Sequence, residues 1–574
     1  MKKIILFACV TMGLSAQAQY FNHDYGSPQL EEPQSGMNTT LNHQGFLISG
    51  LSTNTTTTAV GTIVGYVDKT GNIPGGSTFF VKGYRVKTPA PTNIGMNSRD
   101  GRVLELSSNN FGIAGTAHIT SGSTTYDYIY YIETDTAGAI VGNPVLYDAT
   151  GYISYKLNNM TLSTSTGNAL YLTGYAIVGG SNEERMFVLK INFNGTLIWS
   201  HTYDIDLTAA SADVAYDILE DNANSKLLVV GKTNYHGSDD GVLMTLNPTN
   251  GAALSYDLYG TTSSSDYFSA IIKSNDASSG NGYVLAGGTN ATSGNTDGWM
   301  VRLANNLSTT WSKTYDYNGS GVTNYFSDLV ERVDSMGNYR IYAGGSTVSG
   351  LGGSADMEVD KVTSAGTSIS QFTYGDANGE SLVSIDANST GSVLGLSMFG
   401  YRSVGWLGSF DLTIYKSYFN GVTQCDWYID SITAVNGPVH LISYTADTVN
   451  RFASHSTTAT VGAAQNKTNC SGNTVAGGNN KMLDIALNQA EVHIYNAESA
   501  NNYTIIISKA TAFSTVITVR DMYGRVLYSR NEALQEGENR IPLDLNDLGL
   551  SSGIYIISAT QGKTVQSKKV SVIR

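Results

Sequence analysis

The chain has 574 residues, of which 14% are charged, and its formal net charge is −14. This negative charge argues against a polyanion such as nucleic acid as the main partner, and a hydrophobic content of 41% argues against global disorder. The low charge fraction, the 62 glycines and the 36 tyrosines are typical of a turn-rich all-β protein.

The first 18 residues have the pattern of a secretory signal peptide. Two lysines precede an apolar run and the small-residue segment AQA (16–18), which predicts cleavage between Ala18 and Gln19. A lipoprotein signal ending at Cys9 is the alternative. No later segment reaches the roughly 18–20 apolar residues of a membrane helix. We therefore expect a mature chain without a transmembrane segment, secreted or held at the outer cell surface after passage through the periplasm.

After an N-terminal segment (19–44), residues 45–445 repeat a unit of about 57 residues. An apolar run that ends in glycine marks each copy, and an aromatic residue ends a later alternating run. The glycines are Gly50, Gly115, Gly174, Gly231, Gly287, Gly344 and Gly400, and the aromatic residues are Tyr84, Tyr147, Tyr203, Tyr259, Tyr315, Tyr374 and Tyr418. Both landmarks indicate seven units.

Each unit contains four short segments with period-two alternation, separated by polar turns. One example is the run ending at Gly287, followed by GWMVRL (298–303), TTWSKTY (309–315) and NYFSDLVE (324–331). Four antiparallel strands repeated seven times predict a seven-bladed β-propeller. Eight blades is the alternative, because DWYIDSITA (426–434) and VHLISY (439–444) either complete a blade with the N-terminal segment or begin another.

The repeat resembles that of a large group of secreted bacterial propeller-repeat proteins. Their unit reads roughly GG-x-T, acid-x-W, an apolar strand, a Gly turn and W-x-x-x-Y. The best-matching unit here has Gly287, Gly288, Thr289, Asp297, Trp299, Trp311 and Tyr315 at these positions. The resemblance implies an architecture, which by itself assigns no function.

Residues 446–481 are small and polar without a usable period, which indicates a linker. Cys425 and Cys470 could pair in an oxidising compartment, and their spacing matches no zinc-ligand pattern. From Met482 to Arg574, alternating segments separated by turns predict a small β-sandwich.

This C-terminal region resembles the sorting domain recognised by the type IX secretion machinery of Bacteroidetes. It has the order DMYGRVL (521–527), ENRIPLDL (538–545), SSGIYII (551–557) and KKVSVIR (568–574). The motif residues are Tyr523, Gly524, Gly553, Tyr555, Lys568 and Lys569. The resemblance implies that residues 482–574 bring the protein to this machinery for passage across the outer membrane. An Ig-like binding module is the alternative.

Five units have an acid before the second strand: Asp127, Glu184, Asp240, Asp297 and Asp356. Carboxylates gathered on one rim would bind a hard cation such as Ca²⁺. Alternatively, each acid fixes a turn by accepting hydrogen bonds from its amides. We favour the second interpretation, because residues that a fold requires recur in every repeat. No other cofactor is predicted.

The sequence contains no HExxH, GxSxG or phosphate-loop motif. His236 with Asp239 and Asp240 is its most polar non-repeated constellation. We therefore expect an exported, non-catalytic propeller that binds a surface glycan or protein. The alternatives are a secreted polysaccharide hydrolase or lyase with a site at the propeller axis, and a structural component of the cell surface or gliding apparatus.

Overall fold

The computed structural model divides into two compact units, residues 1–474 and 475–574, which are described separately. In the first unit it describes residues 21–26, 30–39, 45–53, 59–69, 71, 79–88, 94–205, 212–261, 263–291, 294–316, 322–334, 337–348, 355–375, 379–388, 395–403, 410–417, 427–430, 434–436, 442–444, 447–450, 453–456, 459–463 and 465–468. In the second it describes residues 491–496, 502–509, 514–521, 525–533, 537–546, 548, 550, 553–561 and 564–572. The predicted signal cleavage site, Ala18 and Gln19, and both remaining cysteines lie outside these residues.

Within its described residues the first unit contains seven antiparallel sheets, which we number in chain order and name from the innermost strand outward. Sheet 1 contains β2 (Leu30–Asn38), β3 (Phe46–Thr53), β4 (Val60–Val67), β5 (Phe80–Val86) and β35 (Ala459–Ala463). Sheet 2 contains β6 (Asn97–Ser98) with β7 (Arg102–Glu105), then β8 (Phe111–Ser121), β9 (Thr124–Thr134), β10 (Ile140–Asp148) and β34 (Ala453–Ser456). Sheet 3 contains β11 (Tyr152–Leu162), β12 (Ala169–Val178), β13 (Glu184–Asn192), β14 (Leu197–Asp204) and β33 (Asp447–Asn450).

The other four sheets repeat this order. Sheet 4 contains β15 (Val214–Asp221), β16 (Lys226–Thr233), β17 (Asp240–Leu246), β18 (Ala253–Tyr259) and β32 (Ile442–Tyr444). Sheet 5 contains β19 (Asp266–Ser274), β20 (Gly282–Thr289), β21 (Asp297–Leu303), β22 (Thr309–Tyr315) and β31 (Ala434–Asn436). Sheet 6 contains β23 (Asn324–Val333), β24 (Tyr339–Thr347), β25 (Asp356–Thr363), β26 (Ser368–Tyr374) and β30 (Trp427–Asp430). Sheet 7 contains β27 (Glu380–Asn388), β28 (Gly395–Ser403), β29 (Phe410–Ser417), β1 (Phe21–Gly26) and β36 (Gln465–Thr468).

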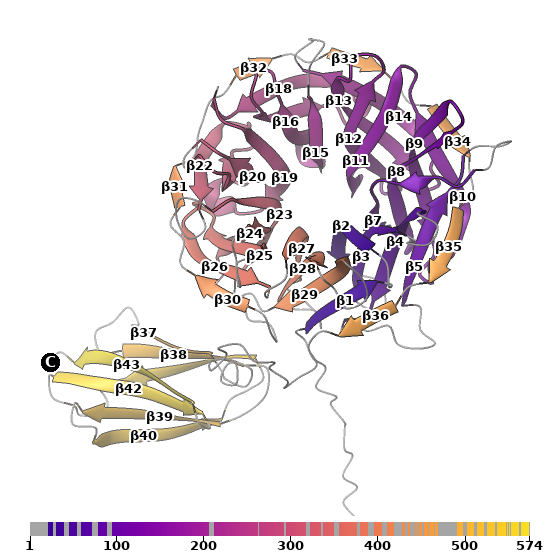
Figure 1. The fold of residues 1–574 in the computed structure, drawn as a ribbon. Coiled ribbons are helices and arrows are strands. Elements are labelled where there is room, and N and C mark those ends of the chain that lie inside the picture. The colour runs from indigo at the N-terminus through magenta and orange to yellow at the C-terminus, as the bar shows by residue number, and fades with distance from the viewer. Residues whose placement is uncertain are drawn as a thin grey trace, which may run out of the picture. The chain divides into compact units, whose positions relative to one another are not determined.

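The sheets surround a common axis, with β2, β7, β11, β15, β19, β23 and β27 nearest to it (Figure 1). Leaving aside the outermost strand, each sheet has the four-stranded antiparallel form of a propeller blade. The predicted repeat is offset by one strand from the sheets, because the fourth strand of each sequence unit is the innermost strand of the next sheet. The described helices are two 3₁₀ turns, Asn222–Asn224 and Ala277–Ser279.

The segment from residue 427 to 468, which we call the belt, adds one outermost strand to every sheet. It passes from sheet 6 backward through sheets 5, 4, 3, 2 and 1 to sheet 7, and its strands β30 to β36 lie on the outer rim in Figure 1. The sequence pattern differs from this result in two respects. The described strands of the segments 426–434 and 439–444, which are β30, β31 and β32, lie on sheets 6, 5 and 4 rather than in a seventh or eighth blade, and the expected linker at 446–481 includes four strands. These short polar segments can form strands because they pair with the sheet edges through backbone hydrogen bonds, which need no large apolar side chains.

The N-terminal strand β1 completes sheet 7 between β29 and the belt strand β36. Its Tyr25 is paired with Leu412 on one side and with Asn466 on the other. The first and last parts of the unit therefore share one sheet, which joins its two ends by backbone hydrogen bonds.

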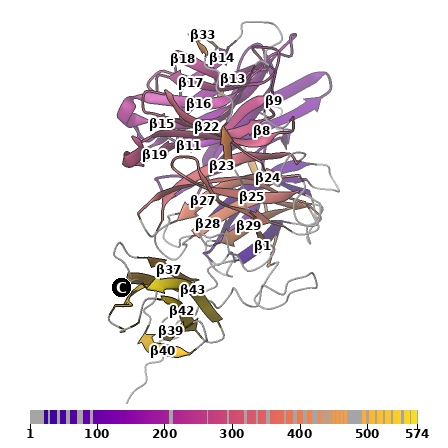
Figure 2. The same ribbon diagram turned by 90° about the vertical axis from the view of Figure 1, so that its left-hand side faces the viewer.

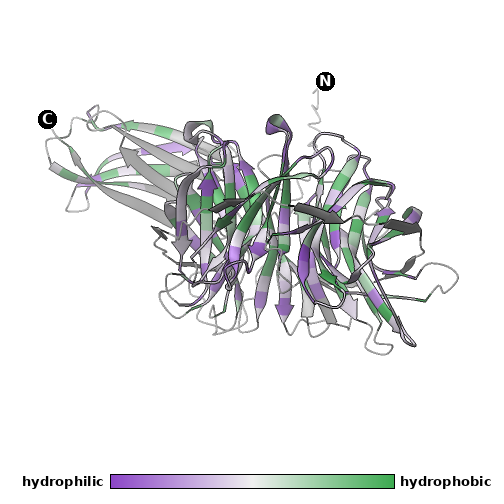
Figure 3. Ribbon diagram, turned by 90° about the horizontal axis from the view of Figure 1, so that it is seen from above, coloured by the Kyte–Doolittle hydropathy of each residue, from purple (hydrophilic) through white to green (hydrophobic). Residues whose placement is uncertain are grey.

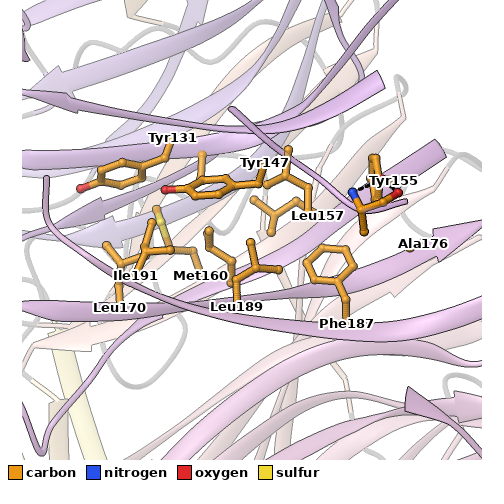
Figure 4. Packing of buried hydrophobic residues seen from close by; sticks show 14 of the residues in the cluster. Tyr131, Tyr147, Tyr155, Leu157, Met160, Leu170, Ala176, Phe187, Leu189 and Ile191 are labelled. Carbon is orange, nitrogen blue, oxygen red and sulfur yellow. Dashed lines mark hydrogen bonds between the residues drawn. The ribbon is translucent and has the colours of Figure 1, made fainter. Parts of the chain in front are cut away.

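A cluster of buried apolar side chains fills each junction between neighbouring sheets, including that between sheets 7 and 1. Figure 4 shows the junction of sheets 2 and 3, where Tyr131 and Tyr147 face Leu170 and Leu189. Green hydrophobic segments recur along the strands in Figure 3. The apolar cores therefore lie between neighbouring sheets rather than around a single centre. Burial of each large apolar side chain in them contributes about 1.5–3 kcal/mol to the stability of the fold.

In six of the seven sheets the innermost strand bulges opposite a glycine of the next strand, and in five of these the glycine is the sequence landmark. In sheet 5, Phe268 pairs with Gly287 and Ala270 with Ala286, so Ser269 is the extra residue. A Cβ on Gly287 would lie 2.0 Å from the carbonyl oxygen of Tyr267. The landmark is thus explained by close backbone approach.

One landmark in the sequence alignment is displaced by one residue. In sheet 6 the bulge lies opposite Gly345, where a Cβ would lie 1.7 Å from the Tyr325 oxygen, and not opposite Gly344. The tandem glycines of this unit made the two choices equivalent in sequence.

The second unit consists of two antiparallel sheets around one core (Figure 2). One sheet contains β37 (Glu491–Asn496), β38 (Asn502–Lys509) and β41 (Gly537–Asp544). The other contains β40 (Val526–Ala533), β39 (Ser514–Asp521), β42 (Gly553–Gln561) and β43 (Thr564–Val572). Ile517, Leu543 and Ile557 are among the buried residues that the two sheets share.

Candidate functional site

The five repeated acids lie at the same end of their sheets, on the third strand from the axis. Asp240, Asp297 and Asp356 are at most 2% exposed, and each pairs with a threonine that ends the neighbouring strand. Asp127 forms an ion pair with Arg99 (Nη1 to Oδ2, 2.8 Å), and Glu184 is half-buried at the start of β13. Burial raises the pKa of the Asp127 carboxyl to about 7, although Arg99 acts in the opposite direction.

Within the described ranges, no three His, Cys, Asp or Glu side chains are grouped so that they could hold a metal ion. Each repeated acid instead lies in its own sheet, among the groups that join strands. For example, Asp127 Oδ1 accepts a hydrogen bond from the Tyr155 amide of sheet 3 (3.3 Å), and Asp240 Oδ2 lies 2.6 Å from His236 Nδ1. The arrangement of these acids therefore suits strand and turn fixation better than Ca²⁺ binding.

Four of the landmark tyrosines join consecutive sheets, and a fifth landmark, Tyr418, lies outside the described residues. The Tyr315 hydroxyl donates to the carbonyl of Gly366 in the next sheet (2.9 Å). The hydroxyls of Tyr84, Tyr147 and Tyr203 likewise each donate to a glycine carbonyl in the sheet that follows their own. The accepting glycine belongs to a turn and has a positive φ, 71° at Gly366. This explains why the tyrosine and the turn glycine recur together.

Closer to the axis, hydrogen bonds at the level of the bulge cross all seven junctions. The Ile271 amide donates to Asp217 Oδ2 (2.8 Å), and the Ile385 amide donates to Asp328 Oδ2 (2.9 Å). Ser384 Oγ donates to the Gly36 carbonyl (2.7 Å), which joins sheet 7 to sheet 1. The remaining four contacts are Val103 N to Ser35 Oγ, Leu157 N to Asp100 Oδ2, Asn159 Nδ2 to Asp217 Oδ1 and Ser269 Oγ to Phe326 O.

Asp217 and Asp328 are the two carboxylates from different sheets that a hydrolase at the axis would require. Burial raises the pKa of Asp217 to about 6 and that of Asp328 to about 7. Their four oxygens already accept hydrogen bonds, with Ile218 and Leu329 donating to the two Oδ1 atoms. These acids are therefore built into the ring of strands, which limits their availability to a substrate.

Arg102 of sheet 2 pairs with Ala114, the residue before Gly115. Asp217 and Asp328 have the same register position in sheets 4 and 6. Its Nε is buried without a hydrogen-bond partner among the described residues. Burial lowers the pKa of Arg102 to about 10, and the charges of Asp100, Asp217 and Asp328 partly offset this effect. Arg102 is thus a non-repeated donor near three acids.

Each of sheets 3 to 7 has one partly exposed tyrosine at or near the bulge of its innermost strand. We call these five tyrosines the collar. They are Tyr175, Tyr216, Tyr267, Tyr325 and Tyr401. The register places four of them at one level, since Tyr175 and Tyr401 directly follow landmark glycines, while Tyr267 and Tyr325 pair with the residues that follow Gly287 and Gly345. Tyr216 is the bulge residue of sheet 4.

Neighbouring collar residues interact. The rings of Tyr216 and Tyr267 are 6.2 Å apart. Burial raises the pKa of Tyr267, and Tyr325 and Tyr216 raise it further; Tyr325 likewise raises the pKa of Tyr401. The sequence contains the collar tyrosines in segments such as VAYD, DYFS and NYFS. It did not predict the collar, because the position of each tyrosine relative to the other sheets depends on the bulge.

The charged groups around the collar are largely paired. Lys232 Nζ lies 2.9 Å from Asp239 Oδ2, and His236 Nδ1 lies 2.6 Å from Asp240 Oδ2. Burial, with the charges of Asp239 and Glu184, raises the pKa of Tyr216 to about 12. The constellation of His236, Asp239 and Asp240 therefore lies beside the collar as one ion pair, between Asp239 and Lys232, and one hydrogen bond between His236 and Asp240.

A second non-repeated group lies in the junction of sheets 5 and 6. Glu358 and Asp360 are both 0% exposed, at positions where sheet 5 has Trp299 and Val301. Gln371 Nε2 donates to Glu358 Oε1, and neither oxygen of Asp360 has a hydrogen-bond partner in the described part of the chain. Burial raises the pKa of both carboxyls, that of Asp360 to about 8.

In the second unit, Gly553 and Tyr555 lie in β42, and Lys568 and Lys569 lie in the neighbouring strand β43, where they pair with Ile557 and Ile556. Tyr555 contributes to the core of the unit. Tyr523 and Gly524 lie outside the described residues. None of the helices that the structure describes is long and apolar enough to cross a membrane.

A family model described as "Secretion system C-terminal sorting domain" matches residues 493–573. This match supports the predicted sorting function of the second unit. Such a domain marks proteins that are exported across the outer membrane by type IX secretion, to the cell surface or the medium. The chain is therefore an exported all-β protein.

Similar solved structures include two of Sqt1 from Chaetomium thermophilum. One is 8% identical with a TM-score of 0.36, and it covers 68% of this chain and 98% of that chain. The other, bound to the N-terminus of the ribosomal protein L10, is 10% identical with a TM-score of 0.34 and the same coverage. The search of curated proteins gives no match. At these values the likeness bears on neither ligand nor activity.

Proposed function

We propose that residues 21–468 form a seven-bladed β-propeller and that the mature protein is an exported, non-catalytic binding protein for a surface glycan or protein. In this proposal residues 1–18 are the signal peptide and residues 482–574 are the sorting domain. Apolar clusters and axial hydrogen bonds at every junction support the ring. The repeated residues have structural partners, so the ligand meets non-repeated ones.

The collar is the observation that carries the binding role. Its tyrosines are partly exposed, and three of them, Tyr175, Tyr267 and Tyr325, lie between two buried neighbours of the same strand. Aromatic side chains with a polar hydroxyl are enriched at binding surfaces, because they offer both apolar faces and hydrogen bonds.

The test is retention of cell-envelope material by the immobilised mature protein, before and after treatment of that material with periodate or with protease. Loss of retention after periodate indicates a glycan, and loss after protease indicates a protein. Failure to retain any envelope material contradicts the proposal. Release of new reducing ends from polysaccharide, abolished in Asp328→Asn, would instead favour the hydrolase.

A further inference from the structure

We propose that the collar and Arg102 together bind a neutral polysaccharide. This inference rests on the proposed binding function and specifies its ligand. Three properties of the described residues carry it: the aromatic faces, the balance of charge and the donor at the bulge level.

The aromatic faces favour a ligand with apolar faces of its own. Five tyrosines from five consecutive sheets form a curved row, rather than a single isolated ring. The C–H faces of pyranose rings stack on such side chains, while the sugar hydroxyls remain free to hydrogen-bond. A chain of sugars presents these faces repeatedly, which matches a row of tyrosines better than a small ligand does.

The balance of charge disfavours an acidic ligand. Of the bases near the collar, Lys232 is paired with Asp239, Arg99 with Asp127 and Arg402 with Glu380. Lys156, which pairs in register with Tyr175, is exposed and interacts with the charge of Glu184. Deeper along the strands, Arg102 is near Asp100, Asp217 and Asp328. A uronic acid, sulfate or phosphate would meet more carboxylates than free cations, and like charges repel.

Arg102 supplies a donor that the described part of the fold does not use. The buried Nε has no hydrogen-bond partner among the described residues, and a buried donor without a partner costs free energy. A sugar hydroxyl would remove this cost by accepting from Arg102. Arg102 lies in sheet 2, beside sheet 3 of the collar, and its register position is about three residues from the level of Tyr175, on the order of 10 Å along the strand direction at 3.3 Å per residue. A ligand that contacts both is therefore a chain of several sugars.

The experiment is calorimetric titration of the full mature protein with cellohexaose, laminarihexaose and maltohexaose as neutral probes, and with hexagalacturonate as the acidic probe. We expect at least one neutral probe to bind and the acidic probe to bind more weakly. Tyr216→Ala and Tyr267→Ala should each weaken binding about 2–10-fold, as expected for loss of an aromatic stacking partner. Arg102→Met should weaken it about tenfold or more, because a hydrogen bond to a charged group is lost.

The matched control is Tyr339→Ala. Tyr339 is also a partly exposed tyrosine, but it lies at the other end of sheet 6, at the start of β24. Its removal should leave binding unchanged, and thermal unfolding should show that all variants are folded.

Three results overturn the inference: no neutral probe binds, hexagalacturonate binds more tightly, or Tyr267→Ala and Tyr339→Ala bind equally well. If the protein still retains envelope material in any of these cases, the proposed binding function stands and only the ligand class is wrong. If it retains none and binds no probe, both fail.

Discussion

Gly287 is fixed by the backbone of its own sheet rather than by a ligand. Its α-carbon faces the bulge of the innermost strand, where a methyl group would collide with the Tyr267 carbonyl. Overpacking of this kind costs about 1–3 kcal/mol, and more where backbone must move. Gly287→Ala should therefore lower the free energy of unfolding by at least this amount.

Gly83→Ala is the matched control for this substitution. Gly83 also lies within a strand, β5, but a Cβ there would meet no atom within 4 Å. Denaturant unfolding of both variants tests the explanation. Equal stability of Gly287→Ala and Gly83→Ala would show that the bulge does not require the glycine.

Glu358 and Asp360 predict how stability depends on pH. An unfolded Asp titrates near pH 4, whereas burial raises the Asp360 pKa to about 8 in the folded protein. Between these values the folded state holds a proton that the unfolded state has lost, so this group makes stability fall as pH rises from about 4 to about 8. Glu358 acts in the same direction.

Asp360→Asn should remove part of this dependence. Thermal unfolding should give similar midpoints for the variant and the wild type near pH 4, and a higher midpoint for the variant near pH 8, with a gain of at least about 1.4 kcal/mol, the value of one pKa unit. A variant that is less stable than the wild type at pH 8 would indicate that the ionised carboxylate has a partner.

At the scale of single residues, the sequence predicted what repeats and missed what does not. Gly287 and Tyr315 were found because a shared geometry recurs at each junction. Tyr216 and Tyr267 could not be aligned, because an inserted bulge residue changes the spacing between strand start and axial level. Arg102 could not be predicted as a site residue, because it differs from Asp217 and Asp328 only at a register position that the sequence does not reveal.

Among the elements, the belt is what the sequence could not predict. Its strands are three to five residues long, too short for a reliable alternating pattern. Each pairs with an edge created by residues far away in the chain, such as Asp257 with Ser443. The four-stranded sheets were predictable because their strands are longer, mostly consecutive and half-buried.

The belt covers the edge of every sheet, and unpaired edges promote association between chains. A chain ending at residue 417 should therefore form larger species than the full mature protein. A chain ending at residue 474, which keeps the belt and lacks the second unit, is the control and should keep the size distribution of the mature protein. Size-exclusion chromatography with light scattering measures this. Identical behaviour of the two truncated chains would mean that the belt does not protect the edges.

For the whole molecule, we propose that the two units divide the tasks of export and binding. The sorting domain match covers residues 493–573, within the second unit, while the collar and Arg102 belong to the first. The resemblance in motif order was sufficient to predict the destination from sequence. Ligand chemistry was not predictable, because it depends on residues from five or more sheets that meet only after folding.

The most direct test of this division is the location of a chain that ends at residue 474, compared with the full chain, in cells of a type IX secreting bacterium. Cell fractionation and digestion of intact cells with added protease measure the location. The full chain should be found in the medium or be digested at the cell surface, and the truncated chain should remain intact in the periplasm. Arrival of the truncated chain outside the cell with the same efficiency as the full chain would contradict the assignment of sorting to the second unit.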